Sequence, residues 1–423
     1  MNEKKTPAIR FQGFTDDWEH HKLGEIFSPL NNNTLSRSEL NDEQGTIQNV
    51  HYGDVLIKFG EYLNVKEQEI PFVNPSVMLS NIDFLQNGDI IFADTAEDAT
   101  VGKCTEMSGI DGHKVVSGLH TMPFRPVVKF ADGYLGCYLN SNAYHDQLFP
   151  LMQGIKVTSI SKRALHDTLL TYPSDRKEQS QLGNYFIHLD HIITLHQRKL
   201  TKLQLLKKSM LTKMFPKDGA RVPEIRFQGF HGDWKEQRLS KLAEVKDSAR
   251  IPNSLWTSEG VPYIRASDLT NDDLSGTLFL SSDTFSFYKN RTGAPEKGDV
   301  LFNGGGEIGK ALLKPDDSDI YVQGGAVLYV KTSHAENLSG EYLTMYFQSP
   351  FAKDYINIAQ AGGTMKHFTL QPAQDMPIVY PSDEEQHKIG VYFQHLDNLY
   401  AIHQRKLSKL QKIKQAMLSK LFV

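Results

Sequence analysis

The feature that most constrains this 423-residue chain is that long stretches of its sequence occur twice. Residues 7–14 read PAIRFQGF and residues 223–230 read PEIRFQGF. A second repeated segment begins with YPSD, at residues 172–175 and again at 380–383, and both copies continue through the phrase HQRKL. The offset of roughly 210 residues is far longer than the unit of a solenoid. The chain is therefore predicted to be a duplicated half-molecule.

The repeats divide the chain into six parts. Two short repeated segments each contain a tryptophan, Trp18 or Trp234, and two longer ones carry the HQRKL phrase. The two regions between them differ widely and share little beyond a GDIIF or GDVLF phrase followed by Gly-Lys. Two similar supports thus carry two diverged domains. In chain order the six parts cover residues 1–27, 28–171, 172–216, 217–245, 246–379 and 380–423.

Each longer repeated segment is predicted to be one long helix, because apolar residues recur every seven positions and again four positions later. Since both copies share this seam, the helices are expected to pack on each other, as rods of roughly 60 Å. Ser174 and Ser382 are the expected N-caps, and Pro216 is expected to end the first helix. The seam comprises Leu182, Leu189, His196, Leu203 and Met210 with Phe186, Ile193, Leu200 and Met214, and in the second copy Ile389, Leu396, His403, Leu410 and Met417 with Phe393, Tyr400, Leu407 and Leu421.

Two features of these helices leave alternatives open. His196 and His403 interrupt the seam, either as polar residues that fix its register or as a metal pair or pH sensor. The basic residues are either a solvated face or a contact for phosphates or an acidic partner. These residues are Arg198, Lys199, Lys202, Lys207, Lys208 and Lys213, and Arg405, Lys406, Lys409, Lys412 and Lys414.

The diverged regions are predicted to be mixed α/β, with many short strands and loops rich in Gly, Asn, Asp and Pro. Helices are expected over Tyr134–Tyr144 and Tyr342–Phe351. Strands are expected over Asp89–Ala93, Asp299–Asn303, Ala326–Lys331 and Met376–Tyr380.

No catalytic constellation emerges from the sequence. The phrase NGGGEIGKA at 303–311 matches G-x-G-x-x-G and nearly matches a phosphate loop, but Ala311 stands where the Mg²⁺-binding hydroxyl belongs. Two cysteines rule out a disulfide scaffold and fit a cytoplasmic location, and no signal peptide, membrane span or metal motif is found. A net charge of -4 means that any DNA binding must use local basic patches.

The repeated IRFQGF and YPSD…HQRKL segments and the GDIIF and GDVLF phrases resemble the specificity (S) subunit of type I restriction-modification systems, over essentially the whole chain. The resemblance implies two DNA target-recognition domains joined by two long helices in an antiparallel coiled coil, with an internal pseudo-twofold repeat. It implies no catalysis and no cofactor on this chain. Double-stranded DNA, methyltransferase subunits (two of them) and motor-nuclease subunits would be the partners, with S-adenosylmethionine, ATP and Mg on those subunits and no membrane involved.

Basic residues in the two diverged regions are the candidates for DNA contact, since Lys and Arg bind phosphates and guanine edges. The alternatives are a coiled-coil adaptor that binds proteins without nucleic acid, and a nucleotide-dependent enzyme built on residues 304–310. The candidate DNA-binding residues are Lys103, Arg125, Lys156 and Lys162 in the first region and Arg265, Arg291, Lys310 and Lys366 in the second.

Overall fold

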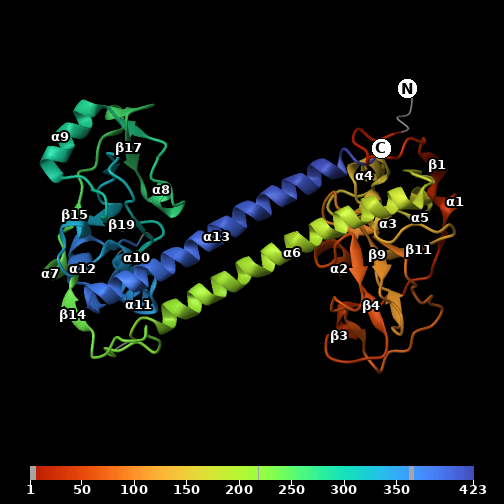
Figure 1. The fold of residues 1–423 in the computed structure, drawn as a ribbon, viewed down its shortest axis with the longest axis horizontal. Helices are drawn as coiled ribbons and strands as arrows, with labels where there is room; N and C mark the ends of the chain where they lie inside the picture. The colour runs from red at the N-terminus through yellow and green to blue at the C-terminus, as the bar shows by residue number, and fades with distance from the viewer. Residues whose placement is uncertain (1–5, 218, 362–365) are drawn as a thin grey trace. The chain divides into compact units, whose positions relative to one another are not determined.

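The computed structural model describes residues 6–217, 219–361 and 366–423, which form two compact units (Figure 1). Unit 1 contains the chain up to Arg198 together with Gln404–Val423, and unit 2 contains Lys199–His403. Each unit therefore combines one diverged region with parts of both long helices. Among the described residues no helix is long and apolar enough to cross a membrane.

Unit 1 is built on a five-stranded sheet of order β2-β11-β7-β9-β5, antiparallel except for the parallel β5–β9 pair. Its strands are β2 (Phe27–Pro29), β11 (Thr121–Pro126), β7 (Ile90–Ala93), β9 (Cys104–Ser108) and β5 (Tyr62–Asn64). A second sheet contains β10 (Val115–Ser117), β4 (Gln48–Val50), β6 (Phe72–Val73) and β3 (Leu40–Asn41), and β12 (Thr158–Ser159) pairs with β8 (Thr95–Ala96). The helices are α1 (Leu23–Ile26), α2 (Tyr52–Ile57), α3 (Tyr134–Leu139), α4 (Asn142–His145), α5 (Lys162–His166) and the first part of α6 (Arg176–Lys213).

Unit 2 repeats the main sheet without its fifth strand. The order is β15-β22-β19-β20, with β15 (Val245–Asp247), β22 (Val327–Val330), β19 (Val300–Asn303) and β20 (Ala311–Leu313). A second sheet contains β16 (Trp256–Thr257), β18 (Phe279–Leu280), β17 (Val261–Ile264) and β21 (Tyr321–Val322). The helices are α7 (Leu239–Leu242), α8 (Ala266–Thr270), α9 (Ser282–Thr292), α10 (Gly340–Gln348), α11 (Pro350–Ala359), α12 (Leu370–Asp375) and the first part of α13 (Asp383–Leu418).

The strands expected from the sequence are present as β7, β19, β22 and β23 (Pro377–Tyr380), but both helices expected in the diverged regions are interrupted. The first breaks after Leu139, and Ser141 then precedes α4. The second breaks at Ser349, whose hydroxyl accepts a hydrogen bond from the Ala352 amide and so caps α11. In unit 1 the Ser141 hydroxyl instead donates to the Tyr138 carbonyl at 2.6 Å, so a serine cap of the next helix forms in unit 2 and not at Ser141.

In both units the short repeated segment is fastened to the start of the long helix. Strand β1 (Glu19–Lys22) pairs antiparallel with β13 (Leu169–Tyr172), and β14 (Lys235–Arg238) pairs in the same way with β23. Arg10 makes a two-pronged ion pair with Glu178 at 2.6 and 2.8 Å. Arg226 makes the same pair with Glu385 at 2.7 and 2.8 Å. The sequence repeat is therefore a repeat of structure.

The ends of the long helices differ in part from the prediction. Ser382 directly precedes α13, as expected. At α6, however, the N-cap is Asp175 rather than Ser174, because the Asp175 carboxylate accepts a hydrogen bond from the Lys177 amide at 2.7 Å. A carboxylate is also favoured at the positive end of a helix dipole. Pro216 lies beyond the last helical residue, Lys213.

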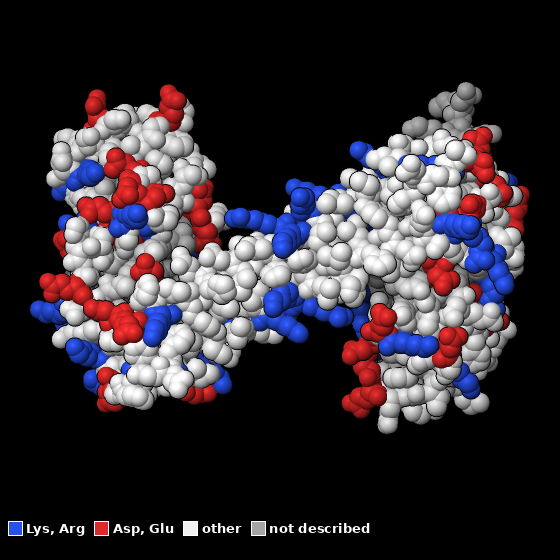
Figure 2. All heavy atoms as spheres, viewed as in Figure 1, with Lys and Arg blue, Asp and Glu red and all other residues white. Residues whose placement is uncertain are grey.

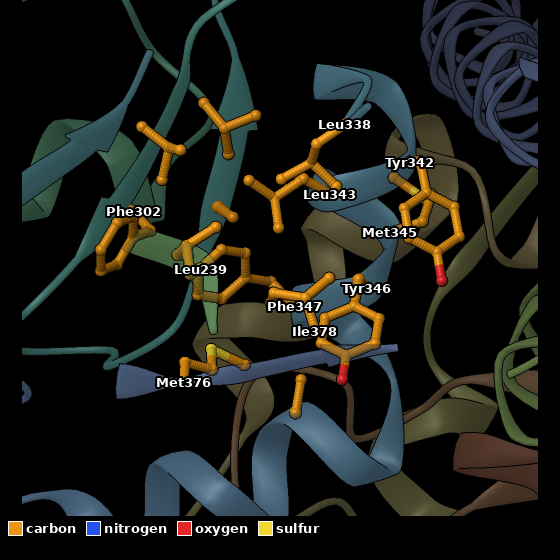
Figure 3. Close-up of a cluster of buried hydrophobic side chains, with 14 of the residues drawn as sticks. Leu239, Phe302, Leu338, Tyr342, Leu343, Met345, Tyr346, Phe347, Met376 and Ile378 are labelled. Carbon is orange, nitrogen blue, oxygen red and sulfur yellow. The ribbon is translucent and has the colours of Figure 1, made fainter. Parts of the chain in front are cut away.

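Each unit is closed by a phenylalanine that comes from the other repeat's long-helix segment. In unit 2, Phe215 at the end of α6 packs with ring centroids 5.6–6.4 Å from those of Trp234, Tyr342, Tyr346 and Phe393. Figure 3 shows part of this core, in which side chains from α7, β19, α10 and β23 meet. In unit 1 the equivalent contacts, at 5.6–6.5 Å, join Phe422 to Trp18, Tyr134, Tyr138 and Phe186.

The residues of the predicted helix seam are buried or partly buried in both units. Near Phe186, α6 packs against the end of α13, and the two helices run antiparallel. Phe186 contacts Phe422, and Asp190, further along α6, contacts the earlier residue Lys414. Buried seam residues are Leu182, Phe186, Leu189, Ile193, Leu203, Met214, Ile389, Phe393, Leu396 and Leu421. The remaining seam residues are partly buried: His196, Leu200, Met210, Tyr400, His403, Leu407, Leu410 and Met417.

Truncating the seam is expected to have unequal effects at its two equivalent leucines. Leu203 is 6% exposed, so Leu203→Ala should lower the free energy of unfolding by about 2–3 kcal/mol. Leu410 is only partly buried, and Leu410→Ala should cost about 1 kcal/mol. Urea unfolding of the two variants measures the difference, and equal losses would contradict the unequal burial of the two leucines.

The seam is flanked by ion pairs that differ between the units. The Lys414 ammonium lies 2.7 Å from Glu61 and 2.6 Å from Asp190. At the equivalent place in unit 2, Lys207 pairs with one carboxylate of the described part of the chain, Asp397, at 2.7 Å. Glu61 directly precedes β5, the strand that the main sheet of unit 2 lacks. Burial and the neighbouring Glu61 carboxylate raise the pKa of Asp190 to about 7, and the Lys414 ammonium opposes this rise.

The raised pKa of Asp190 predicts a pH dependence of stability. In the unfolded chain this carboxyl loses its proton near pH 4, whereas the folded unit retains it to about pH 7. The stabilisation from that proton is therefore complete below pH 4 and is lost as the pH rises to 7. Asp190→Asn should remove the decline measured by thermal unfolding between pH 5 and 8. An unchanged decline would mean that another group is responsible.

Candidate nucleic-acid interface

Two loops lie together at the same place in both units. The first follows the central strand, after Ala93 of β7 or Asn303 of β19, and returns through a glycine. The amide of Gly102 donates to the Ala93 carbonyl at 2.9 Å, and the amide of Gly309 donates to the Asn303 carbonyl at the same distance. Both glycines have positive φ, +82° and +79°, which side-chain-bearing residues rarely adopt.

The second loop is closed on itself by a short antiparallel bridge. The bridge joins Gln153 to Ser159 in unit 1 and Ala361 to His367 in unit 2, where the intervening residues 362–365 lie outside the described part. Each second loop is then fastened to the first loop. The Ile160 amide donates to the Asp94 carbonyl at 2.9 Å, and the Phe368 amide donates to the Gly304 carbonyl at 2.8 Å. The two units thus present an equivalent pair of loops on the same framework.

The glycine-rich phrase of unit 2 does not form a nucleotide-binding loop. A dinucleotide or phosphate loop leads from a strand into a helix, whose N-terminus binds the phosphates. Here the loop leads into β20, which pairs antiparallel with β19, so the phrase forms the turn of a hairpin. A Cβ added at Gly309 would lie 2.8 Å from the Ile356 side chain. The glycine is therefore required for close packing of the turn against α11.

Three of the eight candidate DNA-binding residues have exposed side chains, and two of them lie in the second loops. Lys156 projects from the loop 153–159, and Lys366 lies next to His367 of the equivalent bridge. Arg291 is exposed near the end of α9 in unit 2. A long cationic side chain that is free to move is well suited to a phosphate.

Three candidate lysines are turned toward the protein instead. The Lys103 ammonium donates to the Leu56 carbonyl at 2.8 Å, and burial lowers its pKa. Lys162 donates to the Leu30 carbonyl at 3.0 Å. Lys310 lies 2.8 Å from the Asp272 carboxylate. These three side chains would have to exchange an internal partner for DNA.

The remaining two candidates, Arg125 and Arg265, each form an ion pair with a carboxylate. Arg125 of β11 binds Asp89 through two nitrogens at 2.9 and 2.7 Å, and Asp89 is 1% exposed. Arg265 binds Asp268 at 3.1 and 3.0 Å and the Thr277 hydroxyl at 2.6 Å. Two-pronged pairs of this kind fix the guanidinium geometry. Both arginines therefore contribute to the fold itself.

A cluster that sequence reasoning missed lies beside the loop pair of unit 1. His120 has a positive φ of +54°, its Nδ1 lies 3.1 Å from Asp94, and its ring contacts Tyr52 edge-on at 5.3 Å. Tyr52 also contacts His51, whose pKa is lowered by burial. Imidazole, phenol and carboxylate groups provide both hydrogen-bond donors and acceptors for base edges. No sequence signal joins positions 51 and 120, because only the fold brings them together.

The long helices carry a strongly basic surface. No Asp or Glu occurs between His191 and Lys217 or from Asn398 to Val423. Figure 2 shows Lys and Arg gathered over the helices, whereas both signs of charge are mixed over the globular parts of the visible face. The exposed basic residues include Arg198, Lys199, Lys202 and Lys208 on α6 and Arg405, Lys406, Lys409 and Lys412 on α13. The described residues contain no group of three or more side chains suited to hold a metal ion.

Comparison with known sequences gives a match to one family model and to relatives that include two proteins of Methanocaldococcus jannaschii. The type I restriction modification DNA specificity domain model matches residues 231–412. The chain is 20% identical to a Methanocaldococcus jannaschii protein described as a type I restriction enzyme MjaX specificity subunit, over 96% of this chain and 92% of that protein. It is 19% identical to the MjaVIII specificity subunit of the same organism, over 63% of this chain and 64% of that protein.

Two solved structures have a similar fold. The S subunit of a type I restriction-modification system from M. genitalium matches with a TM-score of 0.63 and 14% identity, over 99% of both chains. A chain from a structure describing complex assembly and conformational transition of the type I R-M system matches with a TM-score of 0.51 and 18% identity, over 96% of this chain and 97% of that chain. Residues 231–412 thus match the type I restriction modification DNA specificity domain, and the resemblance of the whole chain to type I specificity subunits, first seen in its repeated segments, is confirmed.

Proposed function

We propose that this chain is the DNA specificity subunit of a type I restriction-modification complex and recognises a bipartite, asymmetric site. The observation that carries the proposal is the loop pair, which recurs on the same backbone hydrogen bonds in both units with different side chains. The loop 153–159 reads QGIKVTS and the equivalent 361–367 reads AGGTMKH. Base edges are distinguished by side chains, so a shared framework with different loops suits two half-sites of different sequence.

In this proposal the phosphates are bound by side chains that the fold leaves free. Lys156, Arg291 and Lys366 are exposed in the diverged regions, and the long helices add an acid-free basic surface. Local patches of this kind supply the sequence-independent part of DNA affinity even when the net charge of the chain is -4. Lys103, Arg125, Lys162, Arg265 and Lys310, which have internal partners, would position the loops.

The chain would have no catalytic role of its own and would position other subunits. Its repeated segments fold alike in the two units, down to the Arg10–Glu178 and Arg226–Glu385 pairs, and would therefore offer two similar surfaces. Two copies of one methyltransferase subunit would then bind, one at each of these surfaces. S-adenosylmethionine would be bound by those subunits, and ATP and Mg by motor-nuclease subunits.

Salt dependence of DNA binding tests the proposal. The probe is a duplex selected from a random library by the full chain together with its methyltransferase subunits. Each phosphate contact steepens the dependence of log affinity on log salt by about 0.9. Lys156→Ala and Lys366→Ala should therefore each reduce the slope by about one unit. Lys241→Ala, at an exposed position on α7, is the control and should leave the slope unchanged.

The same measurement discriminates against the adaptor alternative. A chain that binds only proteins would select no duplex from the library and would show no salt-dependent DNA affinity. Slopes that stay unchanged in both lysine variants would assign the phosphate contacts to other residues while leaving DNA recognition in place.

A further inference from the structure

The tip of the second loop in unit 1 exposes aliphatic side chains to solvent. Ile155 is fully exposed, at 102%, and Val157 is 53% exposed, with the exposed Lys156 between them. Isolated exposed apolar residues are common, but a branched aliphatic side chain with no packing partner at the tip of a closed loop is unfavourable in the free protein. The loop therefore has the composition of a contact surface.

The backbone holds these side chains outward. The amide of Gln153 donates to the Ser159 carbonyl at 2.9 Å, and the amide of Ser159 donates back at 2.8 Å. Gly154 has a φ of +118°, and a Cβ added there would lie 2.0 Å from the Val157 carbonyl oxygen. Only glycine fits this turn without displacing the loop. The Ile155 side chain is thus presented on a closed loop whose geometry is fixed.

The loop lies at the proposed DNA interface. Strand β12 at its end pairs with β8 in the first loop, and the neighbouring Ile160 amide is bound to Asp94. In unit 2 the nearest exposed aliphatic side chain is Ile358, which is 85% exposed but lies in α11, before the equivalent loop begins. An aliphatic side chain beside a lysine fits duplex DNA, because the lysine binds a phosphate while the apolar group unstacks adjacent bases. A protein partner would need a wider apolar surface than one loop tip offers.

We propose that Ile155 is a wedge that inserts between two adjacent base pairs of the half-site recognised by unit 1. The inference rests on the proposed function, since it requires DNA at this loop. Insertion would unstack one step and bend the duplex, and the cost of unstacking depends on the sequence of that step. Ile155 would then contribute to specificity without a hydrogen bond to any base.

Fluorescence of 2-aminopurine tests the wedge directly, because this base brightens when it is unstacked. The probe is the duplex selected by the full chain with its methyltransferase subunits. It carries 2-aminopurine in turn at each adenine of both half-sites, except at the adenines that are methylated. In the wild-type complex the fluorescence of 2-aminopurine should increase at one base-pair step, and Ile155→Ala should abolish that increase at saturating protein. Ile155→Leu should retain it. Met78→Ala, at a position that is 95% exposed elsewhere in unit 1, should have no effect.

The outcomes separate the wedge from the proposed function. Failure of the wild-type complex to select or bind any duplex would overturn both. Salt-dependent binding without a brightened step, or with brightening that persists in Ile155→Ala, would overturn the wedge alone. Loss of methyltransferase subunits from purified Ile155→Ala complex would also overturn it, since the exposed side chain would then contact a protein. Circular dichroism of each variant checks that the fold is intact.

Discussion

Replacing residues 246–379 by the corresponding region of a relative should change one half of the methylated sequence completely and leave the other half unchanged. The replaced region begins within β15 and ends within β23, so it contains the loop pair of unit 2 but leaves the loop pair of unit 1 untouched. Both long helices keep their sequence, so the spacing between the half-sites should also stay the same. Mapping of methylated adenines in cells before and after the exchange measures the outcome.

The reciprocal exchange of residues 28–171 is the matched control and should alter the other half. A change in both halves after either exchange would show that the two units do not recognise DNA independently. An altered spacing with both halves intact would show instead that the diverged regions, and not the helices, set the distance.

Lys414→Met should destabilise unit 1 by about 3–5 kcal/mol, because it leaves two carboxylates, Glu61 and Asp190, without the ammonium that lies between them. Methionine keeps most of the volume and the apolar stem, so the loss is chiefly electrostatic. The lost stability should be largest above pH 7, where Asp190 also loses its proton. Urea unfolding at pH 5 and pH 8 measures both effects.

The duplication supplies the control for this prediction. Lys207 occupies the equivalent position in unit 2, where it pairs with the partly exposed Asp397 and, within the described residues, with no second carboxylate. Lys207→Met should therefore cost about 1 kcal/mol or less. Equal losses in the two variants would mean that the Glu61 contact contributes nothing.

The sequence predicted the architecture well because its information is periodic and repeated. The seven-residue pattern located both long helices, and Leu203, Leu396 and Phe393 are buried as that pattern requires. The errors are local. Asp175 displaced Ser174 as N-cap, and Ser349 broke a predicted helix, since a side-chain cap only slightly outweighs the alternatives. Propensity alone does not resolve such small differences.

The candidate site was harder to predict because it depends on contacts distant in sequence. Arg125 and Arg265 have the residue type expected of a side chain that recognises bases. In the structure, however, the Arg125 guanidinium is bound by Asp89 and the Arg265 guanidinium by Asp268. The contacts of His51 and His120 with Tyr52 and the exposure of Ile155 have no sequence signature. Which cation is free and which is paired is decided by tertiary structure.

Because each unit is completed by the end of the other repeat's long-helix segment, the two units finish folding at different times during synthesis. Unit 1 needs Phe422 to close its aromatic pocket, whereas unit 2 receives Phe215 from a helix that is already complete. Synthesis at about 5–20 residues per second leaves the first unit open for about 10–40 s while residues 199–403 emerge from the ribosome. The unit that is translated first is thus the last to finish folding. During that interval Trp18 and Tyr134 lack their final partner, and the nascent chain offers chaperones an apolar pocket.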